Sequence, residues 1–158
     1  MEWIIEAAPV GSAEARAALL AYYTDIVGRY HGRPARRDEV AAAMAAEPSD
    51  DLVPPGGVFL LGRRGGEVGG CAGVRLVEPE TAELTRVHVR SPWRGTGGGS
   101  ALVAAAEAAA ARLGARTIRL DTRSDLVEAR ALYAGRGYRE VEPFCSGPYS
   151  DHWFVKEL

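Results

Sequence analysis

The chain has 158 residues, of which 25% are charged and 47% hydrophobic, a composition ordinary for one soluble globular domain with a core of its own. The formal net charge of −2 lacks the basic excess that general nucleic-acid binding needs, so we expect no nucleic-acid partner. No apolar run reaches the roughly 18 residues of a membrane span, and the first residues lack the features of a signal peptide, so we expect a cytoplasmic protein with no membrane partner.

The two cysteines and three histidines lie far apart in the sequence. Cys71 and Cys145 form no metal-spaced cluster, and His31, His88 and His152 are equally scattered, whereas a structural zinc site needs closely spaced ligands. We therefore expect no metal site. Two buried, reduced thiols fit such a protein, and a single disulfide is the alternative.

In the N-terminal half, apolar runs are separated by serine, proline and glycine, the residues that commonly begin or end helices and strands. Ser12 precedes an apolar pattern of helical period, as an N-cap residue does. Pro48 and the run at 54–57 break the pattern again, and Gly65 and Gly66 join two extended runs as a hairpin. The elements expected here are a strand at 3–6, helices at 13–29 and 38–46, and strands at 58–61, 68–77 and 82–89.

The C-terminal half adds two helices and three strands. An alanine-rich helix is expected at 100–113, where small side chains let it lie close to a sheet. Asp125 and Glu128 resemble a capping box at the start of the next helix. The residues expected on the buried face of the first helix are Leu102, Ala105, Ala109 and Leu113. The remaining elements are a strand at 117–121, a helix that ends at 135–137, and strands at 138–141 and 153–157. The order β-α-α-β-β-β-α-β-α-β-β describes one mixed α/β domain over residues 1–158.

A glycine-rich turn before the alanine-rich helix is the most informative stretch of the chain. A strand that turns through glycines into a helix presents several free backbone N–H groups at one point, and the helix dipole adds positive potential there. The turn is therefore an anion site, and a phosphate-bearing ligand is the first hypothesis. Its residues are Arg94, Gly95, Thr96, Gly97, Gly98, Gly99 and Ser100.

Two familiar phosphate motifs fit this turn poorly. A Walker P-loop needs a lysine before its serine or threonine, but Gly99 is followed directly by Ser100. A dinucleotide fingerprint needs a third glycine where the chain has Ser100, and it belongs to the first strand of a βαβ unit. Asp121 ends the next strand and imitates the ribose-binding acid, so a nucleotide-binding oxidoreductase is a minor alternative.

Three short motifs occur in an order that is more specific than any one of them. They are the strand Glu83–Val89, the pattern R/Q-x-x-G-x-G/A at Arg94, Gly97 and Gly99, and the run Ala129-x-x-Leu132-Tyr133-x-x-x-Gly137-Tyr138. This combination resembles the GCN5-related N-acetyltransferase (GNAT) superfamily, strongly from residue 83 to 138 and more weakly over nearly the whole chain. The resemblance implies an N-acetyltransferase with a mixed, mostly antiparallel sheet flanked by helices.

The resemblance also implies a binding site for acetyl-CoA as co-substrate. The turn would bind the pyrophosphate through backbone amides, which glycines let approach closely. The strand before the turn would pair through its backbone with the pantetheine arm, as an added strand does. The pyrophosphate positions are Arg94, Gly95, Thr96, Gly97, Gly98, Gly99 and Ser100, and the pantetheine positions are Val87, His88 and Val89.

Two catalytic side chains follow from the resemblance, for direct attack of an amine on the thioester. Tyr133 would act as general acid on the departing thiolate, since a phenol with a pKa of about 10 suits a thiol leaving group. Glu83 would act as general base, directly or through water, and His88 is a second candidate because histidine titrates near neutrality. A catalytically inactive CoA-binding sensor is the alternative function.

Two positions depart from the family pattern. Gly98 stands where a bulky aliphatic residue is usual, which removes a core anchor and loosens the helix start by roughly 1 kcal/mol. Leu126 stands where an asparagine often meets the cofactor, so that contact is absent. The backbone amide donors of the turn are expected to remain in place.

The acceptor is expected between the first two helices and the C-terminal segment. Aromatic side chains with a few polar groups suit a small amine, and the candidate substrate contacts are Tyr22, Tyr23, Tyr30 and Tyr149. The acceptor is left open between a small-molecule amine and a peptide amine. A homodimer through the C-terminal strands is common in the family and is expected on that ground alone.

Overall fold

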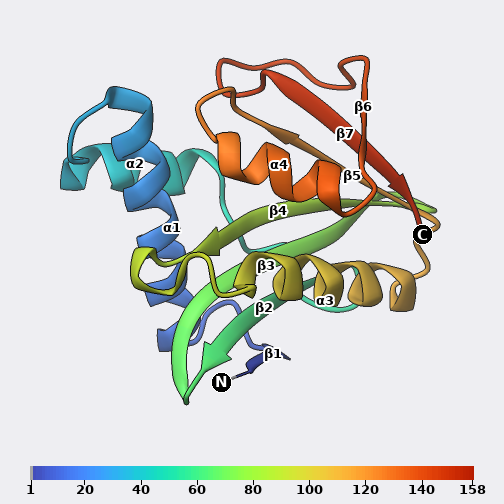
Figure 1. The fold of residues 1–158 in the computed structure, drawn as a ribbon, viewed down its shortest axis with the longest axis horizontal. Helices are drawn as coiled ribbons and strands as arrows, with labels where there is room; N and C mark the ends of the chain where they lie inside the picture. The colour runs from blue at the N-terminus through green and yellow to red at the C-terminus, as the bar shows by residue number, and fades with distance from the viewer. Residues whose placement is uncertain (1) are drawn as a thin grey trace.

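The computed structural model describes residues 2–158, which form a seven-stranded sheet with helices on both faces (Figure 1). The strands are β1 (Trp3–Ala7), β2 (Gly57–Arg64), β3 (Glu67–Glu78), β4 (Thr81–Val89), β5 (Thr117–Thr122), β6 (Arg139–Val141) and β7 (His152–Glu157). The helices are α1 (Ala13–His31), α2 (Arg37–Ala46), α3 (Gly98–Arg112) and α4 (Val127–Gly135), with a short 3-10 turn η1 (Ser91–Trp93).

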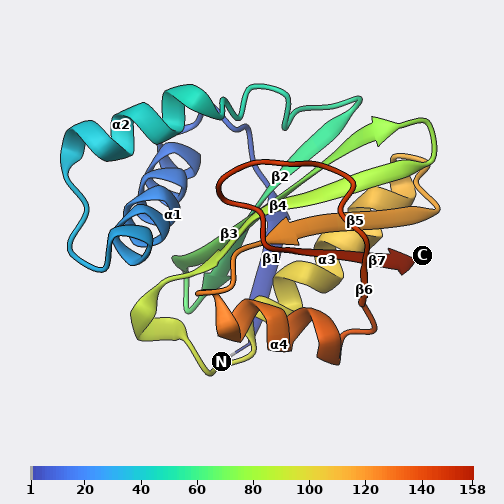
Figure 2. The same cartoon turned by 90° about the horizontal axis from the view of Figure 1, so that it is seen from above.

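The sheet has the strand order β1-β2-β3-β4-β5-β7-β6. Neighbouring strands are antiparallel except β4 and β5, which are parallel. Helices α1 and α2 lie on one face of the sheet and α3 and α4 on the other (Figure 2). The expected order of elements and the mixed, mostly antiparallel sheet are confirmed.

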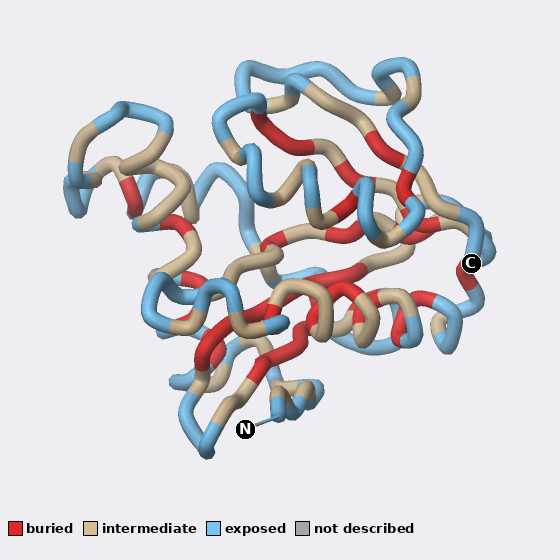
Figure 3. The backbone as a smooth tube through the Cα atoms, in the orientation of Figure 1, coloured by how far each residue is buried: buried red, intermediate tan, exposed pale blue. Residues whose placement is uncertain are grey.

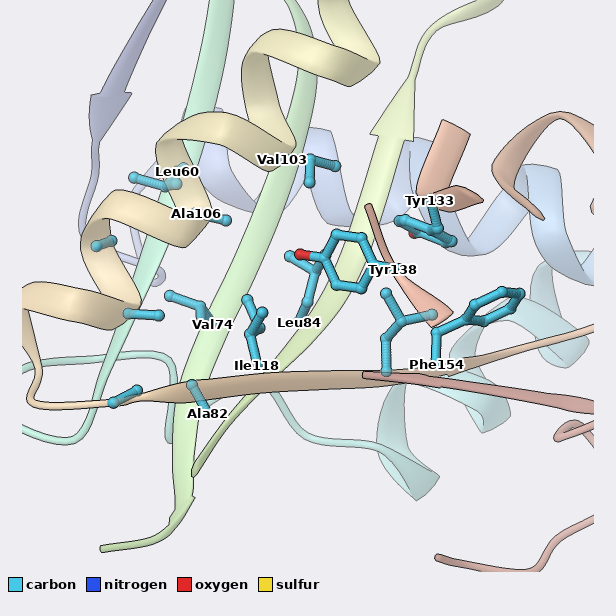
Figure 4. Close-up of a cluster of buried hydrophobic side chains, with 14 residues drawn as sticks. Leu60, Val74, Ala82, Leu84, Val103, Ala106, Ile118, Tyr133, Tyr138 and Phe154 are labelled. Atoms are coloured by element: carbon cyan, nitrogen blue, oxygen red, sulfur yellow. The ribbon is translucent and has the colours of Figure 1, made fainter. Parts of the chain in front are cut away.

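Buried side chains form two clusters, one on each face of the sheet. The larger cluster lies between the sheet and helices α3 and α4 and contains Leu84, Ile118 and Tyr133 (Figure 4). The second joins α1 and α2 to the sheet through Tyr23 and Phe59. Figure 3 shows that the buried backbone follows the central strands, where both faces are covered.

Strand alternation decides which side chains of β4 and β5 reach which face. Leu84 and Leu120 are buried in the cluster under α3 and α4. Because successive side chains of a strand point to opposite faces, Glu83 and Asp121 lie on the face of α1 and α2. Two carboxylates therefore face the same side of the sheet from neighbouring strands.

Helix α1 begins where the sequence predicts and ends two residues later. The Ser12 hydroxyl accepts a hydrogen bond from the Ala15 amide at 3.2 Å, which caps the helix. Gly32 closes it in the left-handed conformation with a φ of 69°, as glycine commonly does at a helix C-terminus. These two extra residues carry Tyr30 towards the C-terminal part of the chain.

The expected inner face of α3 is confirmed but incomplete. Leu102 and Ala109 are buried, and Ala105 and Leu113 are half-buried and pack against the same cluster. Alanine occupies most positions of this helix, so every face looks almost equally apolar and the sequence alone does not show how far the buried face extends. The buried side chains are Leu102, Val103, Ala106, Ala109 and Ala110.

The capping box expected at α4 is wrong. Leu126 holds the N-cap position, and no side chain caps the helix. The Asp125 carboxylate accepts two hydrogen bonds from Arg123, at 2.9 and 2.8 Å, and Glu128 pairs with Arg29 of α1. Guanidinium–carboxylate bonds are stronger than a bond to a neutral backbone amide, so they determine where both acids point.

Both cysteines are free thiols. Cys71 is buried as expected, and burial raises the pKa of its thiol to about 12. The expectation of a second buried thiol is wrong, because Cys145 is exposed on the β6–β7 connection. Its sulfur accepts a hydrogen bond from the Trp153 indole at 3.3 Å.

Candidate functional site

Strands β4 and β5 pair along a short segment and then separate. Only three residue pairs join them in the described chain, Thr81–Glu83 with Thr117–Arg119. Beyond this segment, β4 continues to Val89 with no strand against its β5-facing edge. Backbone groups on an open strand edge can pair with an extended ligand, so this edge suits the expected pantetheine arm beside Val87, His88 and Val89.

A β-bulge marks the beginning of the open edge. Between Cys71 and Gly73 of β3 the register shifts, so Arg86 and Val87 together lie opposite one residue of β3. Arg86 has a φ of 54° and is 5% exposed. Its guanidinium donates to the backbone oxygen of Glu47 at 2.9 Å, which ties the end of α2 to the bulge.

The glycine-rich turn leads from β4 to an uncapped helix N-terminus. Gly95 and Gly97 adopt left-handed φ values of 77° and 88°, which other residues adopt only with strain. Helix α3 starts at Gly98 with no side chain capping it. The N–H groups of residues 98–100 have no partner within the helix, so they form an anion cradle that fits a phosphate.

Trp3 of β1 packs against this turn. A Cβ at Gly98 would lie 2.5 to 2.9 Å from three carbons of the Trp3 indole. The indole N–H donates to the backbone oxygen of Thr96 at 3.2 Å and to its hydroxyl at 3.1 Å, and that hydroxyl donates to the backbone oxygen of Trp93. The Thr96 side chain is therefore engaged within the turn.

Arg94 connects the turn to α1. Its guanidinium donates to Asp25 Oδ2 at 2.8 Å and to the Val89 backbone oxygen at 3.0 Å. The same carboxylate oxygen lies 3.3 Å from His88 Nε2, and the His88 ring stands edge-on to Tyr22 with centroids 5.9 Å apart. The His88 side chain thus points to α1, whereas its backbone lies on the open edge.

Tyr133 lies on α4 with a free hydroxyl. Its ring packs at tilted angles against Tyr138 and Phe154, with centroids 5.7 and 6.1 Å apart. Burial raises the pKa of Tyr133 above the ordinary phenol range, and the Asp121 carboxylate adds to the shift. The hydroxyl therefore stays protonated at neutral pH, and it has no hydrogen-bond partner among residues 2–158.

Glu83 lies on the last pair before β4 and β5 separate, opposite Arg119. Its carboxylate accepts a hydrogen bond from Arg75 Nη2 at 2.9 Å. The other arm of Arg75 holds Asp51, which follows α2. The structure thus brings Glu83 to the edge of the opening but in an ion pair.

The four tyrosines expected to contact substrate lie in three different settings. Tyr23 is 1% exposed, and its hydroxyl donates to the Glu47 backbone oxygen at 3.2 Å. Tyr22 is half-buried between Tyr23 and His88. Burial raises the pKa of Tyr22, and the neighbouring tyrosines Tyr23 and Tyr133 add to this rise. Tyr22 is therefore close to the opening, whereas Tyr23 belongs to the core.

Tyr30 and Tyr149 meet above the opening. Their rings stand edge-on with centroids 5.1 Å apart, and the Arg123 guanidinium lies over the Tyr30 ring at 5.6 Å. This contact joins the end of α1 to the β6–β7 connection. The connection covers β5 on the face of α1 and α2 (Figure 2).

The end of the β6–β7 connection is fixed to β5. The Ser150 hydroxyl donates to Asp121 Oδ2 at 2.6 Å. The Asp151 amide donates to the Thr122 backbone oxygen at 2.9 Å, and its carboxylate accepts from the Ser124 amide at 2.8 Å. These bonds place the Asp121 carboxylate under the connection at the end of β5.

Sequence reasoning did not assign several residues of this site. Trp3, Arg75 and Ser150 reach it from distant parts of the chain, and nothing in the local pattern marks them. Arg136 had a signal, because it lies inside the run from Tyr133 to Tyr138 that the resemblance identified. Its guanidinium donates to the Ser100 hydroxyl and to Glu107, both at 3.1 Å, and so adds a positive charge at the start of α3.

Two hollows lie on the surface, and the first adjoins the short β4–β5 pairing through Thr81, Thr117 and Arg119. This hollow, of about 690 Å³, is lined mainly by β5, β6 and the residues after β6. The other, of about 420 Å³, lies between β1, β2 and α3. Neither is lined by Glu83 or Tyr133, so the open edge of β4 is the better candidate site.

Comparison with known proteins defines the class to which this fold and site belong. The profile of the Acetyltransferase (GNAT) family matches residues 16–138, so the chain belongs to the GNAT acetyltransferase family and is an acyltransferase by that membership. None of the curated proteins matches the chain in sequence.

Solved structures agree with this assignment over nearly the full length. A Klebsiella pneumoniae protein assigned as an acyl-CoA N-acyltransferase is 26% identical, with a TM-score of 0.74, and the match covers 99% of this chain and 97% of that one. The PaiA N-acetyltransferase of Thermoplasma acidophilum, in complex with coenzyme A, is 15% identical with a TM-score of 0.78 and complete coverage of both chains. A GNAT acetyltransferase of Elizabethkingia anophelis with acetyl-CoA bound is 16% identical, with a TM-score of 0.66 and coverage of 99% and 98%.

Residues 2–158 have two further properties. Within this range, no helix combines the length and the apolar character needed to cross a membrane. Nor does the same range contain a cluster of three or more His, Cys, Asp or Glu side chains arranged to hold a metal ion.

Proposed function

We propose that the protein transfers an acetyl group from acetyl-CoA to a primary amine by direct attack. The observation that carries the proposal is the open edge of β4, which leads directly into the uncapped N-terminus of α3. One ligand with an extended polar arm and a pyrophosphate matches both features. The free hydroxyl of Tyr133 supplies a proton donor on the adjoining helix.

The residues present fit acetyl-CoA. The amides of residues 98–100 would hold the pyrophosphate, with the charges of Arg94 and Arg136 close to the same helix start. Thr96 would take part through its backbone, because its hydroxyl is engaged within the turn. The backbone of Val87 to Val89 would pair with the pantetheine arm. Acetyl-CoA supplies the thioester that the reaction consumes.

Two side chains would move the protons. The acceptor nitrogen forms a bond to the thioester carbonyl carbon, the carbon–sulfur bond breaks, and the amine loses a proton. Glu83 would receive that proton, directly or through a water molecule. Tyr133 would protonate the departing sulfur, which its raised pKa permits because the phenol is protonated before the reaction.

The acceptor would enter on the face of α1 and α2, beneath the β6–β7 connection. Tyr22 lies beside the opening, and Tyr30 and Tyr149 form part of its cover. We leave Tyr23 out of the acceptor site because its side chain is buried in the core. An aromatic pocket with a few polar groups suits a small amine or the amine of a short peptide.

Thermal unfolding tests the binding half of this proposal. Acetyl-CoA and CoA should each raise the melting temperature, whereas NADH and ATP should not. At about 100 times its Kd, a ligand shifts the midpoint of a domain of this size by roughly 5–10 °C. A shift with NADH alone would support the dinucleotide alternative instead.

Release of the CoA thiol tests the catalytic half. Wild-type protein with acetyl-CoA and a panel of primary amines should release thiol in proportion to acetylated product. Binding of CoA with no turnover on any amine would support a CoA-binding sensor in place of an enzyme.

A further inference from the structure

The two carboxylates that face the acceptor side of the sheet differ in their surroundings. Glu83 on β4 is bound by Arg75 at 2.9 Å. Asp121 on β5 has no Lys, Arg or His within ion-pair distance among residues 2–158. Its Oδ2 accepts a hydrogen bond from the Ser150 hydroxyl at 2.6 Å. Asp121 is thus a half-exposed anion without a counter-ion.

The arginines near Asp121 are engaged elsewhere. Arg123 makes two bonds to Asp125. Arg119 lies over the Phe144 ring at 4.5 Å and is 3.8 Å from Glu78. Arg86 donates to backbone oxygens at the end of α2. Asp121 is therefore available to pair with a positively charged group of a ligand.

The position of Asp121 matches the place where the acceptor must react. It is the last residue but one of β5, the strand that separates from β4 to leave the open edge. The Tyr133 ring packs against Phe154, whose partner on β5 is Leu120, the residue before Asp121, so the two groups lie in the same part of the fold. The Ser150 bond engages one carboxylate oxygen and leaves lone pairs of the other free to accept hydrogen bonds.

We infer that Asp121 binds the amino group of the acceptor, and that Ser150 holds the carboxylate in position for it. This inference rests on the proposed function and names a substrate class for the same site. The acceptor is an amine whose reacting nitrogen has no neighbouring carboxylate. The α-carboxylate of an amino acid would be forced close to Asp121, and like charges repel at that distance.

Matched amines test the substrate class. Tyramine and tyrosine differ only in the α-carboxylate, and so do phenethylamine and phenylalanine. Thiol release by wild-type protein should favour tyramine or phenethylamine over its amino acid by at least about tenfold in kcat/KM, the discrimination expected from one charged contact. A preference for the amino acids would overturn the inference.

Asp121→Asn tests the residue itself. The variant should lose on the order of 10- to 100-fold in kcat/KM for the preferred amine, mainly through KM, and should discriminate less against the amino acid. Glu142→Gln is the matched control, because it removes an exposed carboxylate from the β6–β7 connection, which also carries Ser150. Its kcat/KM should stay within about twofold of the wild-type value. The shift in melting temperature with acetyl-CoA should be the same in all three proteins. Unchanged kcat/KM in Asp121→Asn would overturn the inference.

A binding measurement separates this inference from the proposed reaction. With CoA at saturation, tyramine or phenethylamine should raise the melting temperature of the wild type further, and Asp121→Asn should lose this second shift. Amine binding without thiol release would overturn the proposed transferase activity. The amine-induced rise in melting temperature, compared between the wild type and Asp121→Asn, would then decide the Asp121 assignment. If none of the four probes gave turnover or an amine-induced rise in melting temperature, the Asp121 assignment would be overturned. A rise in melting temperature with CoA alone would still show the CoA site.

Discussion

The indole of Trp3 occupies the space that a side chain at position 98 would need. A Cβ built on Gly98 would approach carbons of that indole to between 2.5 and 2.9 Å, closer than such atoms pack. The sequence indicated that Gly98 removes a core anchor from the start of α3. In the structure Trp3 fills that place from β1, so the anchor comes from another strand.

Gly98→Val should therefore destabilise the turn. The added side chain would collide with the indole, and overpacking of this kind costs about 1–3 kcal/mol. We expect a lower melting temperature and a weaker response to acetyl-CoA. The measurement is thermal unfolding with and without the ligand.

A double variant shows whether the two positions share one space. Trp3→Ala removes the indole and should cost about 1–3 kcal/mol by itself. Combined with Gly98→Val, it should be less destabilised than the sum of the two single variants, since the valine would enter the vacated volume. Strict additivity in a double-mutant cycle would contradict the packing described here.

Tyr133→Phe should lower kcat by about 10²–10⁴-fold with little change in stability. The reason is that the hydroxyl has no partner to lose within the described chain, whereas general acid catalysis of this kind contributes about that factor. Tyr138→Phe is the control, because the Tyr138 hydroxyl donates to Glu107 at 2.9 Å. That variant should change the melting temperature and leave kcat nearly as it was, and the reverse result would reassign the acid.

Glu83→Gln should reduce kcat at neutral pH by about 10- to 100-fold, as expected for loss of a general base. Asp51→Asn separates catalysis from structure, since Asp51 shares Arg75 with Glu83 but lies on its other arm. If the two variants lose the same activity, Glu83 acts by fixing Arg75, and the base must be sought elsewhere. The measurement is steady-state thiol release between pH 6 and 9.

The contact of Asp25 with His88 and Arg94 should contribute stability that depends on pH. The His88 imidazole, 3.3 Å away, is the main cause that lowers the pKa of Asp25, with Arg94 adding and burial opposing. A carboxylate whose pKa is lower in the folded state stabilises the fold above its unfolded value of about 3.9, and this contribution disappears as the pH falls through the folded value.

Asp25→Asn should therefore be less stable than the wild type at pH 7, by about 1 kcal/mol for a partly exposed ion pair. The difference should narrow as the pH is lowered from about 4 towards 3. Urea unfolding at several pH values measures it. A difference that grows on acidification would have the wrong sign for this assignment.

The succession of elements could be predicted from the sequence because their boundaries are local. Ser12 caps α1 through a bond to a residue three positions away, and the glycines of the turn carry their conformational freedom with them. The family motif was recognisable for the same reason, since its parts follow one another along the chain.

The contacts that shape the site could not be predicted in this way. The Trp3 indole meets Thr96 across 93 positions of sequence, and Ser150 meets Asp121 across 29. Asp125 and Glu128 had the spacing of a capping box, but arginines at positions 123 and 29 bind them instead. Only the packed fold decides which of several possible partners a charged side chain finds.

The short pairing between β4 and β5 also divides the sheet into two parts that are only weakly joined to each other. Strands β1 to β4 are joined to one another by long ladders, whereas β5, β7 and β6 are attached to them through three residue pairs in the described chain. Amide hydrogens of the C-terminal strands should accordingly exchange with solvent before those of β2 and β3. A ligand lying between β4 and β5 would join the two parts. Bound acetyl-CoA would therefore slow amide hydrogen exchange in the strands on both sides of it.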